Sequence, residues 1–225
     1  MNILMEIYEI LRRSYGPQRW WPVTPTGGRG PEYTGGPKSI TQRFEVAVGA
    51  VLTQNTAWAN AAKAIENLNT EGIMNQEALS DIDERTLAEM IRPAGYFNQK
   101  AKRLKILAAY FCSSQRVTRS GLLELNGVGP ETADSILLYA FNRPRFVVDA
   151  YTRRIFTRVG IISGDELYDN IRSTLEKNLP HSARLYQEYH ALIVEHGKRV
   201  CRRKPLCGDC TVSPLCRAGC GLRVR

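Results

Sequence analysis

The chain has 225 residues, of which 43% are hydrophobic and 24% are charged, a composition typical of a globular protein and not of a disordered one. Its length suits one large domain or two small ones. No apolar run approaches the ~20 residues that a membrane-spanning helix needs. Glu6 and Glu9 interrupt the segment where a signal peptide would be uninterrupted. We therefore expect an intracellular protein without a membrane partner.

Basic residues are in excess and are concentrated near the C-terminus. The chain carries 31 Lys and Arg against 22 Asp and Glu, a formal net charge of +9. Residues 196–225 hold eight basic residues and a single acidic one, Asp209. Such an excess indicates a polyanionic partner.

Apolar residues recur every three or four positions along most of the chain, which predicts helices and an all-α fold. The stripes run over residues 3–11, 58–68, 104–111, 136–140, 151–159, 167–175 and 185–193. Lys100, Lys102, Arg103 and Lys105 lie off the third stripe, as a solvated face would. The apolar run Val46–Leu52 is ambiguous between strand and helix, and we interpret it as helix.

Residues 22–38 interrupt this pattern. Between Pro22 and Pro37, nine of sixteen residues are Gly or Pro, which predicts a connecting loop.

The run Leu125–Ala133 predicts a tight turn between two helices. Gly127 and Gly129 permit positive φ and close backbone approach, and Pro130 suits the first turn of a helix. The amides near Gly127, Val128 and Gly129 would bind a phosphate oxygen without reading sequence. A plain helix-to-helix turn is the alternative.

Asp149 follows an apolar Phe-Val-Val run and directly precedes an amphipathic stripe, so it suits a helix N-cap. Together, the hairpin and this aspartate resemble the helix-hairpin-helix plus Gly/Pro…Asp motif of the endonuclease III superfamily of base-excision DNA glycosylases. The resemblance implies that Asp149 is essential to breaking the N-glycosidic bond. An anion held there would stabilise the positive charge that develops on the sugar.

Four cysteines form a C-x5-C-x2-C-x5-C pattern: Cys201, Cys207, Cys210 and Cys216. Without secretory features, a metal centre explains them better than disulfides. Four thiolates in one loop suit a [4Fe–4S] cluster, and zinc is the alternative. The spacing resembles the cluster loop of endonuclease III, with one residue fewer between the first two cysteines.

Basic side chains lie inside this loop. Arg202, Arg203 and Lys204 fall between the first two cysteines and could reach DNA phosphates as point charges.

Further segments extend the resemblance over most of the chain. Leu52–Thr56 and Gly95–Ala101 look like the family segments that enter DNA where a base has been extruded. By this resemblance Gln54 would fill the gap and Tyr96 would wedge the opposite strand.

One position bears on the chemistry. Bifunctional relatives carry a lysine directly before the Thr-Ala pair of the hairpin helix, and its amine forms a Schiff base that leads to strand cleavage. Here Glu131 stands in that place, which predicts a monofunctional glycosylase. Glu131 would be either a second carboxylate of the pocket or a favourable acid in a helix first turn.

The aromatic residues Trp20, Trp21 and Phe44 match the base-stacking positions of the endonuclease III-like 3-methyladenine DNA glycosylases. The resemblance implies an alkylated purine as substrate, because a cationic base is selected by aromatic faces. A glycosylase for uracil, mismatched or oxidised pyrimidines is the alternative. A non-catalytic DNA-binding protein and a zinc-stabilised structural protein are alternatives from other classes.

The resemblance also predicts the architecture. Residues 39–144 would form a helical barrel with the helix-hairpin-helix at about 117–141, and residues 1–21 with 145–225 would form a second helical domain that carries the cluster loop, 201–216. The active site would lie in the cleft between these two lobes. We expect a monomer that acts on damaged double-stranded DNA in the cytoplasm or nucleoid.

Overall fold

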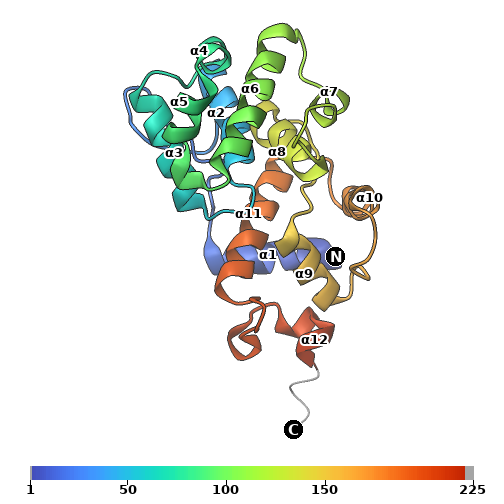
Figure 1. The fold of residues 1–225 in the computed structure, drawn as a ribbon. Coiled ribbons are helices and arrows are strands. Elements are labelled where there is room, and N and C mark those ends of the chain that lie inside the picture. Colours follow the sequence, from blue (N-terminus) through green and yellow to red (C-terminus); the bar gives the residue numbers. More distant parts are fainter. Residues whose placement is uncertain (1, 221–225) are drawn as a thin grey trace. The chain divides into compact units, whose positions relative to one another are not determined.

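The computed structural model describes residues 2–220. Within that range the regular elements are α-helices and short 3-10 helices, and the nearest approach to a sheet is one bridge between Val23 and Glu32 (Figure 1). The all-α prediction is confirmed for these residues, including the run Val46–Leu52, which is helical. No helix of the described range is long and apolar enough to cross a membrane.

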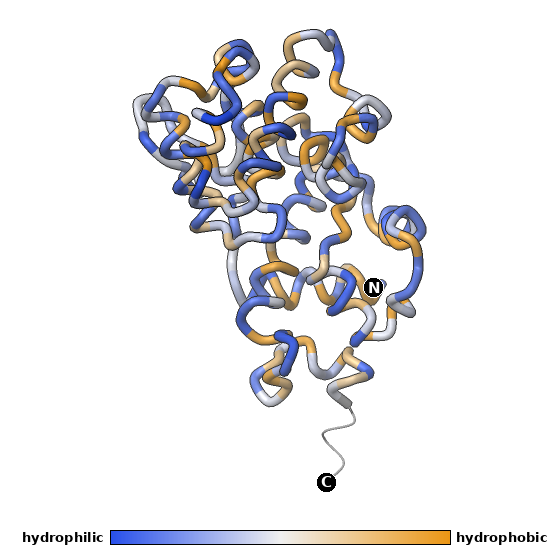
Figure 2. Tube along the Cα trace, viewed as in Figure 1, coloured by the Kyte–Doolittle hydropathy of each residue, from blue (hydrophilic) through white to orange (hydrophobic). Residues whose placement is uncertain are grey.

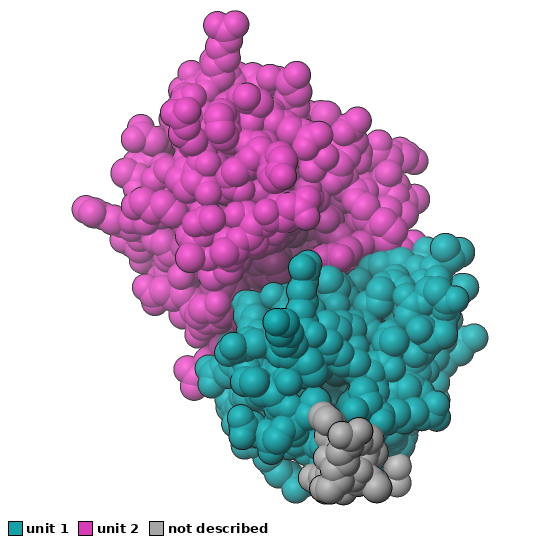
Figure 3. Space-filling view, turned by 60° about the horizontal axis from the view of Figure 1, so that its bottom comes forward, with its two compact units in different colours: residues 1–18, 144–225 teal, residues 19–143 magenta. Residues whose placement is uncertain are grey.

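The chain divides into two compact units, coloured separately in Figure 3. Unit 1 contains residues 1–18 and 144–225, and unit 2 contains residues 19–143. The sequence predicts a boundary after residue 21 and a connecting loop over residues 22–38. In the structure, Trp20, Trp21 and that segment are part of unit 2.

Unit 2 is built around two helices that are buried on nearly all sides. Its elements are α2 (Ile40–Leu52), α3 (Trp58–Thr70), α4 (Gln76–Asp81), α5 (Glu84–Met90), η1 (Arg92–Ala94), α6 (Phe97–Ser113), α7 (Arg119–Leu123) and α8 (Pro130–Phe141). Residues 44–52 of α2 and 132–140 of α8 are buried without interruption, and these two helices pack together. Helices α3 and α6 pack against α2, α7 packs against α8, and α4 and α5 pack against α6. Hydropathy is mixed along these helices (Figure 2).

The polar face of α6 is only partly solvated: Lys102 is exposed, but Lys100 is not. Lys100 is 1% exposed, and its Nζ donates to the carbonyls of Leu52 and Ala94 at 2.8 Å each. Lys105 donates to the carbonyls of Ser80 and Ile82. These amines bind carbonyls at the ends of neighbouring helices, which would otherwise lack partners.

The Gly/Pro-rich segment is anchored by a buried carboxylate. Glu45 on α2 accepts hydrogen bonds from the backbone and hydroxyl of Thr24 and from Asn69. Burial raises the pKa of Glu45. This network fixes the start of the segment against α2 and α3.

Unit 1 joins the N-terminal helix to the C-terminal third of the chain. Its elements are α1 (Ile3–Tyr15), α9 (Ala150–Val159), α10 (Tyr168–Asn178), α11 (Ala183–Arg199), η2 (Cys207–Asp209), η3 (Ser213–Leu215) and α12 (Arg217–Cys220). Helix α11 packs against α1 and α9 (Figure 1). The buried ring of Tyr189 contacts Tyr8, Phe146 and Phe156, and its hydroxyl donates to the carbonyl of Leu4 at 2.8 Å.

Candidate functional site

The turn between α7 and α8 is a tight hairpin in unit 2. Gly127 has φ +86°, and a Cβ on it would lie 2.2 Å from Nε of Arg103. Gly129 is the N-cap of α8, with φ −84° and open space around it, and Pro130 opens the helix. Val128 is buried at 5% exposure, so its side chain anchors the turn and only its backbone is available to a partner.

Gln54 is held over this hairpin, not directed freely into solvent. Its Nε2 donates to the carbonyl of Gly127 at 2.9 Å and to Oγ1 of Thr132 at 3.0 Å. Its Oε1 accepts from Arg103 at 2.7 Å. The structure therefore brings the predicted gap-filling residue together with the predicted phosphate-binding turn.

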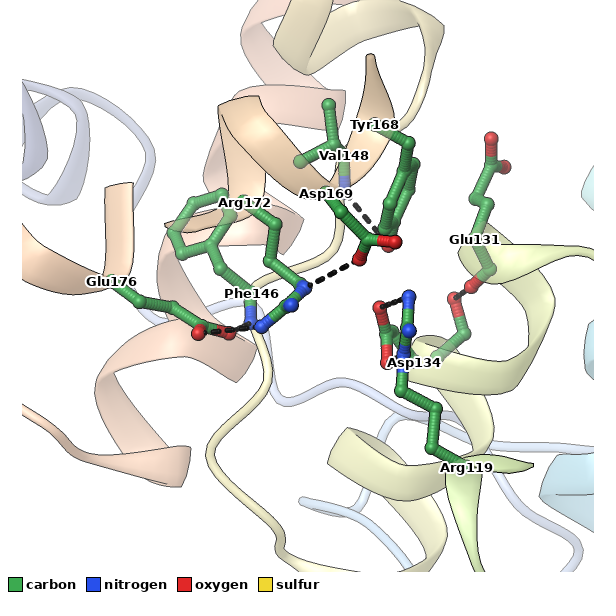
Figure 4. Close-up of polar contacts among 10 residues, drawn as sticks. Arg119, Glu131, Asp134, Phe146, Val148, Tyr168, Asp169, Arg172 and Glu176 are labelled. Atoms are coloured by element: carbon green, nitrogen blue, oxygen red, sulfur yellow. Dashed lines mark hydrogen bonds and ion pairs between the residues drawn. The ribbon is translucent and has the colours of Figure 1, made fainter. Parts of the chain in front are cut away.

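Glu131 lies in the first turn of α8 and is exposed. Its side chain extends away from the ion pair between Arg119 and Asp134, in which Nε and Oδ1 are 2.9 Å apart (Figure 4). The Asp134 side chain is fully buried, and Arg119 contacts both of its oxygens. This pair, which is not evident from the sequence, links α7 to α8 and so stabilises the hairpin.

Asp149 is the N-cap of α9 in unit 1. Its Oδ1 accepts from the backbone amide of Thr152 at 2.7 Å, and its Oδ2 lies 3.5 Å from Nε2 of His190 on α11. Burial would raise the pKa of Asp149, but the contacts with His190 and Thr152 outweigh it and hold the pKa below its ordinary value. The carboxylate is therefore ionised at neutral pH.

Helix α10 holds the backbone that leads to Asp149 (Figure 4). Glu176 accepts from the amide of Phe146 at 2.9 Å, and Tyr168 accepts from the amide of Val148 at 3.4 Å. Arg172 in turn bridges Glu176 and Asp169. Two backbone groups of an extended segment are thus satisfied by side chains of one helix.

The predicted aromatic residues fall into two groups. The Trp21 ring packs against Trp20, Trp58 and Tyr139, with ring centroids 5.1–5.9 Å apart. Phe44 is 1% exposed and packs against Phe111 instead. Trp20 is half-buried, whereas Trp21 is 6% exposed.

Tyr96 presents its ring to solvent at the start of α6. It is 69% exposed and has a left-handed backbone, with φ +47°.

The four predicted cysteine ligands are free and partly exposed. Burial raises the pKa of Cys210, and Cys201, Cys216 and Cys207 act in the same direction. Cys201 Sγ accepts from Nη1 of Arg158 at 3.2 Å. Among residues 2–220, no group of three or more His, Cys, Asp or Glu side chains is placed to hold a metal ion.

A buried histidine reaches the thiol group from α11. His196 is 1% exposed; its Nε2 lies 3.6 Å from Sγ of Cys210 and its Nδ1 2.9 Å from the hydroxyl of Tyr15. Burial lowers the pKa of His196 to about 4, so the ring is neutral at neutral pH.

The basic residues of the cysteine loop are exposed, and their backbone is anchored. Arg158 donates to the carbonyls of Arg202 and Arg203, at 2.6 and 2.9 Å. The side chains of Arg203 and Lys204 face solvent.

Comparison with known proteins decides the family. Residues 48–181, from within α2 to just before α11, match the HhH-GPD superfamily of base excision DNA repair proteins. The chain belongs to this superfamily. The HhH-GPD match includes the hairpin, Glu131 and Asp149.

Relatives of this HhH-GPD protein agree with the assignment. It is 44% identical over 228 residues to a protein of Methanocaldococcus jannaschii assigned to the DNA repair glycosylases, covering 96% of each chain. It is 30% identical to endonuclease III of Thermotoga maritima, over 78% of this chain and 83% of the relative. The crystal structure of Helicobacter pylori 3-methyladenine DNA glycosylase, bound to 1,N6-ethenoadenine, matches with a TM-score of 0.71 and 30% identity, over 88% of this chain and 98% of that one.

The predicted superfamily is therefore confirmed, and the HhH-GPD protein is a base-excision DNA glycosylase. Sequence patterns did not identify His190, because a single histidine on the buried side of a helix carries no spacing signal. Asp134 was missed for the same reason. It is recognisable only through its partner Arg119 in the fold.

Proposed function

We propose that this glycosylase is monofunctional and hydrolyses the N-glycosidic bond of an alkylated purine such as 3-methyladenine, leaving an abasic site. The observation that carries the proposal is Glu131 in the first turn of the hairpin helix, where an amine would be required for strand cleavage. The likeness to the H. pylori 3-methyladenine DNA glycosylase supports the alkylated base.

Asp149 is the proposed catalytic carboxylate. Breaking the bond between base and sugar builds positive charge on the ring, and a fixed anion beside it lowers the energy of that state. The lowered pKa keeps this carboxylate charged, and two contacts restrict its orientation. As an ionised acceptor it can also orient and deprotonate the attacking water.

Lys100 does not restore a lyase mechanism. Burial and the neighbouring Arg103 lower its pKa to about 8, a property that an imine-forming lysine would share. Its Nζ, however, is held by the carbonyls of Leu52 and Ala94 inside the core. We expect no Schiff base, so borohydride should trap no covalent complex with lesion DNA.

For the base pocket we propose Trp20 and Trp21, supported by Trp58 and Tyr139. An electron-rich cluster of this kind stacks well on a cationic alkylated purine. The half-buried ring of Trp20 is the better placed to stack on a base. Phe44 has no exposed face in its contact with Phe111, and we leave it out of the proposed pocket.

For DNA binding we propose that both backbone amides and side chains contact the DNA. The amides of the turn Gly127–Gly129 and the side chains of Arg202, Arg203 and Lys204 would contact phosphates. Gln54 would leave its hairpin contacts to fill the gap of the extruded base, and Tyr96 would wedge the opposite strand. We propose that one monomer carries out these steps, which light scattering of the complex can test.

We propose that Cys201, Cys207, Cys210 and Cys216 hold a [4Fe–4S] cluster. Four free thiols in one loop, with Arg158 donating to one of them, offer the thiolate ligands that such a cluster needs, and the loop would have to bring their sulfur atoms together around it. When bound, the cluster would cross-link the loop that carries Arg203 and Lys204. A brown protein with four irons per chain would support it, and a colourless zinc protein would refute it.

The first experiment is incubation of the purified protein with methylated duplex DNA. Release of methylated purine, with strand breaks only after alkali, is the expected result. Strand breaks without alkali would show that the protein has lyase activity although Glu131 stands in place of the lysine. Asp149→Asn provides the inactive control.

The alternative substrate class is a uracil, mismatched or oxidised pyrimidine, and the similarity to endonuclease III favours it. Absence of purine release, with excision from one of those duplexes, would select this alternative. Excision from no duplex would instead support a non-catalytic DNA-binding protein.

A further inference from the structure

The two oxygens of Asp149 have different neighbours. Oδ1 accepts from the amide of Thr152, and this contact alone is sufficient for a helix N-cap. Oδ2 faces His190, which comes from α11 and lies far away in the sequence. Capping does not account for the second contact.

His190 is buried so deeply that its imidazole needs a polar partner. The residue is 5% exposed, and the Asp149 side chain is 12% exposed. Burying an imidazole and a carboxylate is costly unless they satisfy one another. The Nε2–Oδ2 distance of 3.5 Å lies within the range of an ion pair and is longer than an ordinary hydrogen bond. Because an ionised carboxylate only accepts, a proton on this nitrogen would make the contact attractive.

We propose that His190 is a positioning residue for Asp149, fixing the plane of the carboxylate by holding Oδ2 while Thr152 holds Oδ1. The proposal rests on the role of Asp149 given above. A carboxylate held from two helices needs no reorientation when charge develops on the sugar, which is the advantage of a preorganised site. Helix α10 adds to this by holding the backbone ahead of Asp149.

The test compares two variants on whichever lesion the protein excises. His190→Leu fills similar space without a donor, and His190→Gln keeps an N–H near the position of Nε2. Under single turnover, we expect His190→Leu to slow excision by about a hundredfold, the scale of a catalytic group displaced by ~1 Å. The Kd for lesion DNA should stay the same, and His190→Gln should recover most of the rate.

A double-mutant cycle distinguishes positioning from a general structural effect. In the Asp149→Asn background, His190→Leu should cause no further loss, because the histidine acts through the carboxylate. Tyr186→Phe is the matched control: it lies one turn earlier on α11, is fully buried, and its hydroxyl has no hydrogen-bond partner among residues 2–220. This variant should excise at the wild-type rate.

Two results would overturn the proposal: a wild-type rate for His190→Leu, or an equal slowing in both backgrounds. If Asp149→Asn itself excised normally, the role of Asp149 would be refuted instead. Circular dichroism checks that each variant is folded. Should leucine prevent folding, His190→Asn replaces it, since its shorter amide cannot reach Oδ2.

Discussion

Gly127 and Gly129 stand two residues apart in the hairpin, and the structure imposes different requirements on them. Gly127 combines positive φ with the Arg103 side chain where a Cβ would lie, whereas Gly129 has an ordinary φ and open space. We expect Gly127→Ala to lower the free energy of unfolding by more than about 1 kcal/mol. Gly129→Ala should leave stability unchanged in the same denaturant titration and weaken DNA binding only. Equal losses of stability would contradict this assignment.

Asp149 links stability to pH. Its pKa in the folded protein lies below the ordinary value of 3.8. Its contribution to stability is therefore present at neutral pH and is lost as pH falls through the folded pKa. We expect the Tm difference between wild type and Asp149→Asn to be constant near neutral pH and to shrink below about pH 4. A Tm difference that increased as the pH fell would contradict a lowered pKa for Asp149.

Two arginines of α9 donate hydrogen bonds to segments outside the helix. Arg158 binds Cys201 Sγ and the carbonyls of Arg202 and Arg203. Arg153, on the same helix, binds the carbonyls of Gly164 and Glu166 instead. If the proposed cluster is bound, we expect the Arg158→Ala variant to lose its iron to a chelator several-fold faster than wild type, as measured by visible absorption. The Arg153→Ala variant should lose iron at the wild-type rate.

In helix α6, hydrophobic periodicity predicts the apolar side but not the burial of a lysine. Its apolar stripe is evident in the sequence, because Leu104 and Leu107 face the core at helical spacing. The burial of Lys100 was not predictable, since it depends on carbonyls of Leu52 and Ala94 at the ends of other elements. Motifs with fixed spacing, such as the hairpin followed by Asp149, were identified. Partners such as His190, joined only by tertiary packing, were not.

For the whole molecule, the net charge of +9 makes DNA binding sensitive to salt. If Arg203 and Lys204 each contact a phosphate, their double alanine variant should reduce the slope of log K against log salt by about 2. The matched control replaces Arg12 and Arg13, an exposed basic pair at the end of α1. The salt slope of the Arg12/Arg13 double alanine variant should equal that of wild type. A reduction as large as that of the Arg203/Lys204 variant would mean that DNA binding depends on total charge and not on the position of these residues.

Because unit 1 is formed from two separate segments of the chain, its parts assemble in a fixed order during synthesis. Leu4, Ile7 and Leu11 of α1 are buried, yet α11, against which α1 packs, begins only at Ala183. At ~5–20 residues per second, synthesis of the residues between the two helices takes about 8 to 34 seconds, during which the apolar side of α1 is uncovered. Unit 2 emerges completely in that interval. Tyr15 contacts His196 beside the thiols, and Ser14 contacts Thr211. The cysteine loop therefore reaches its final form only after α1 has packed against α11.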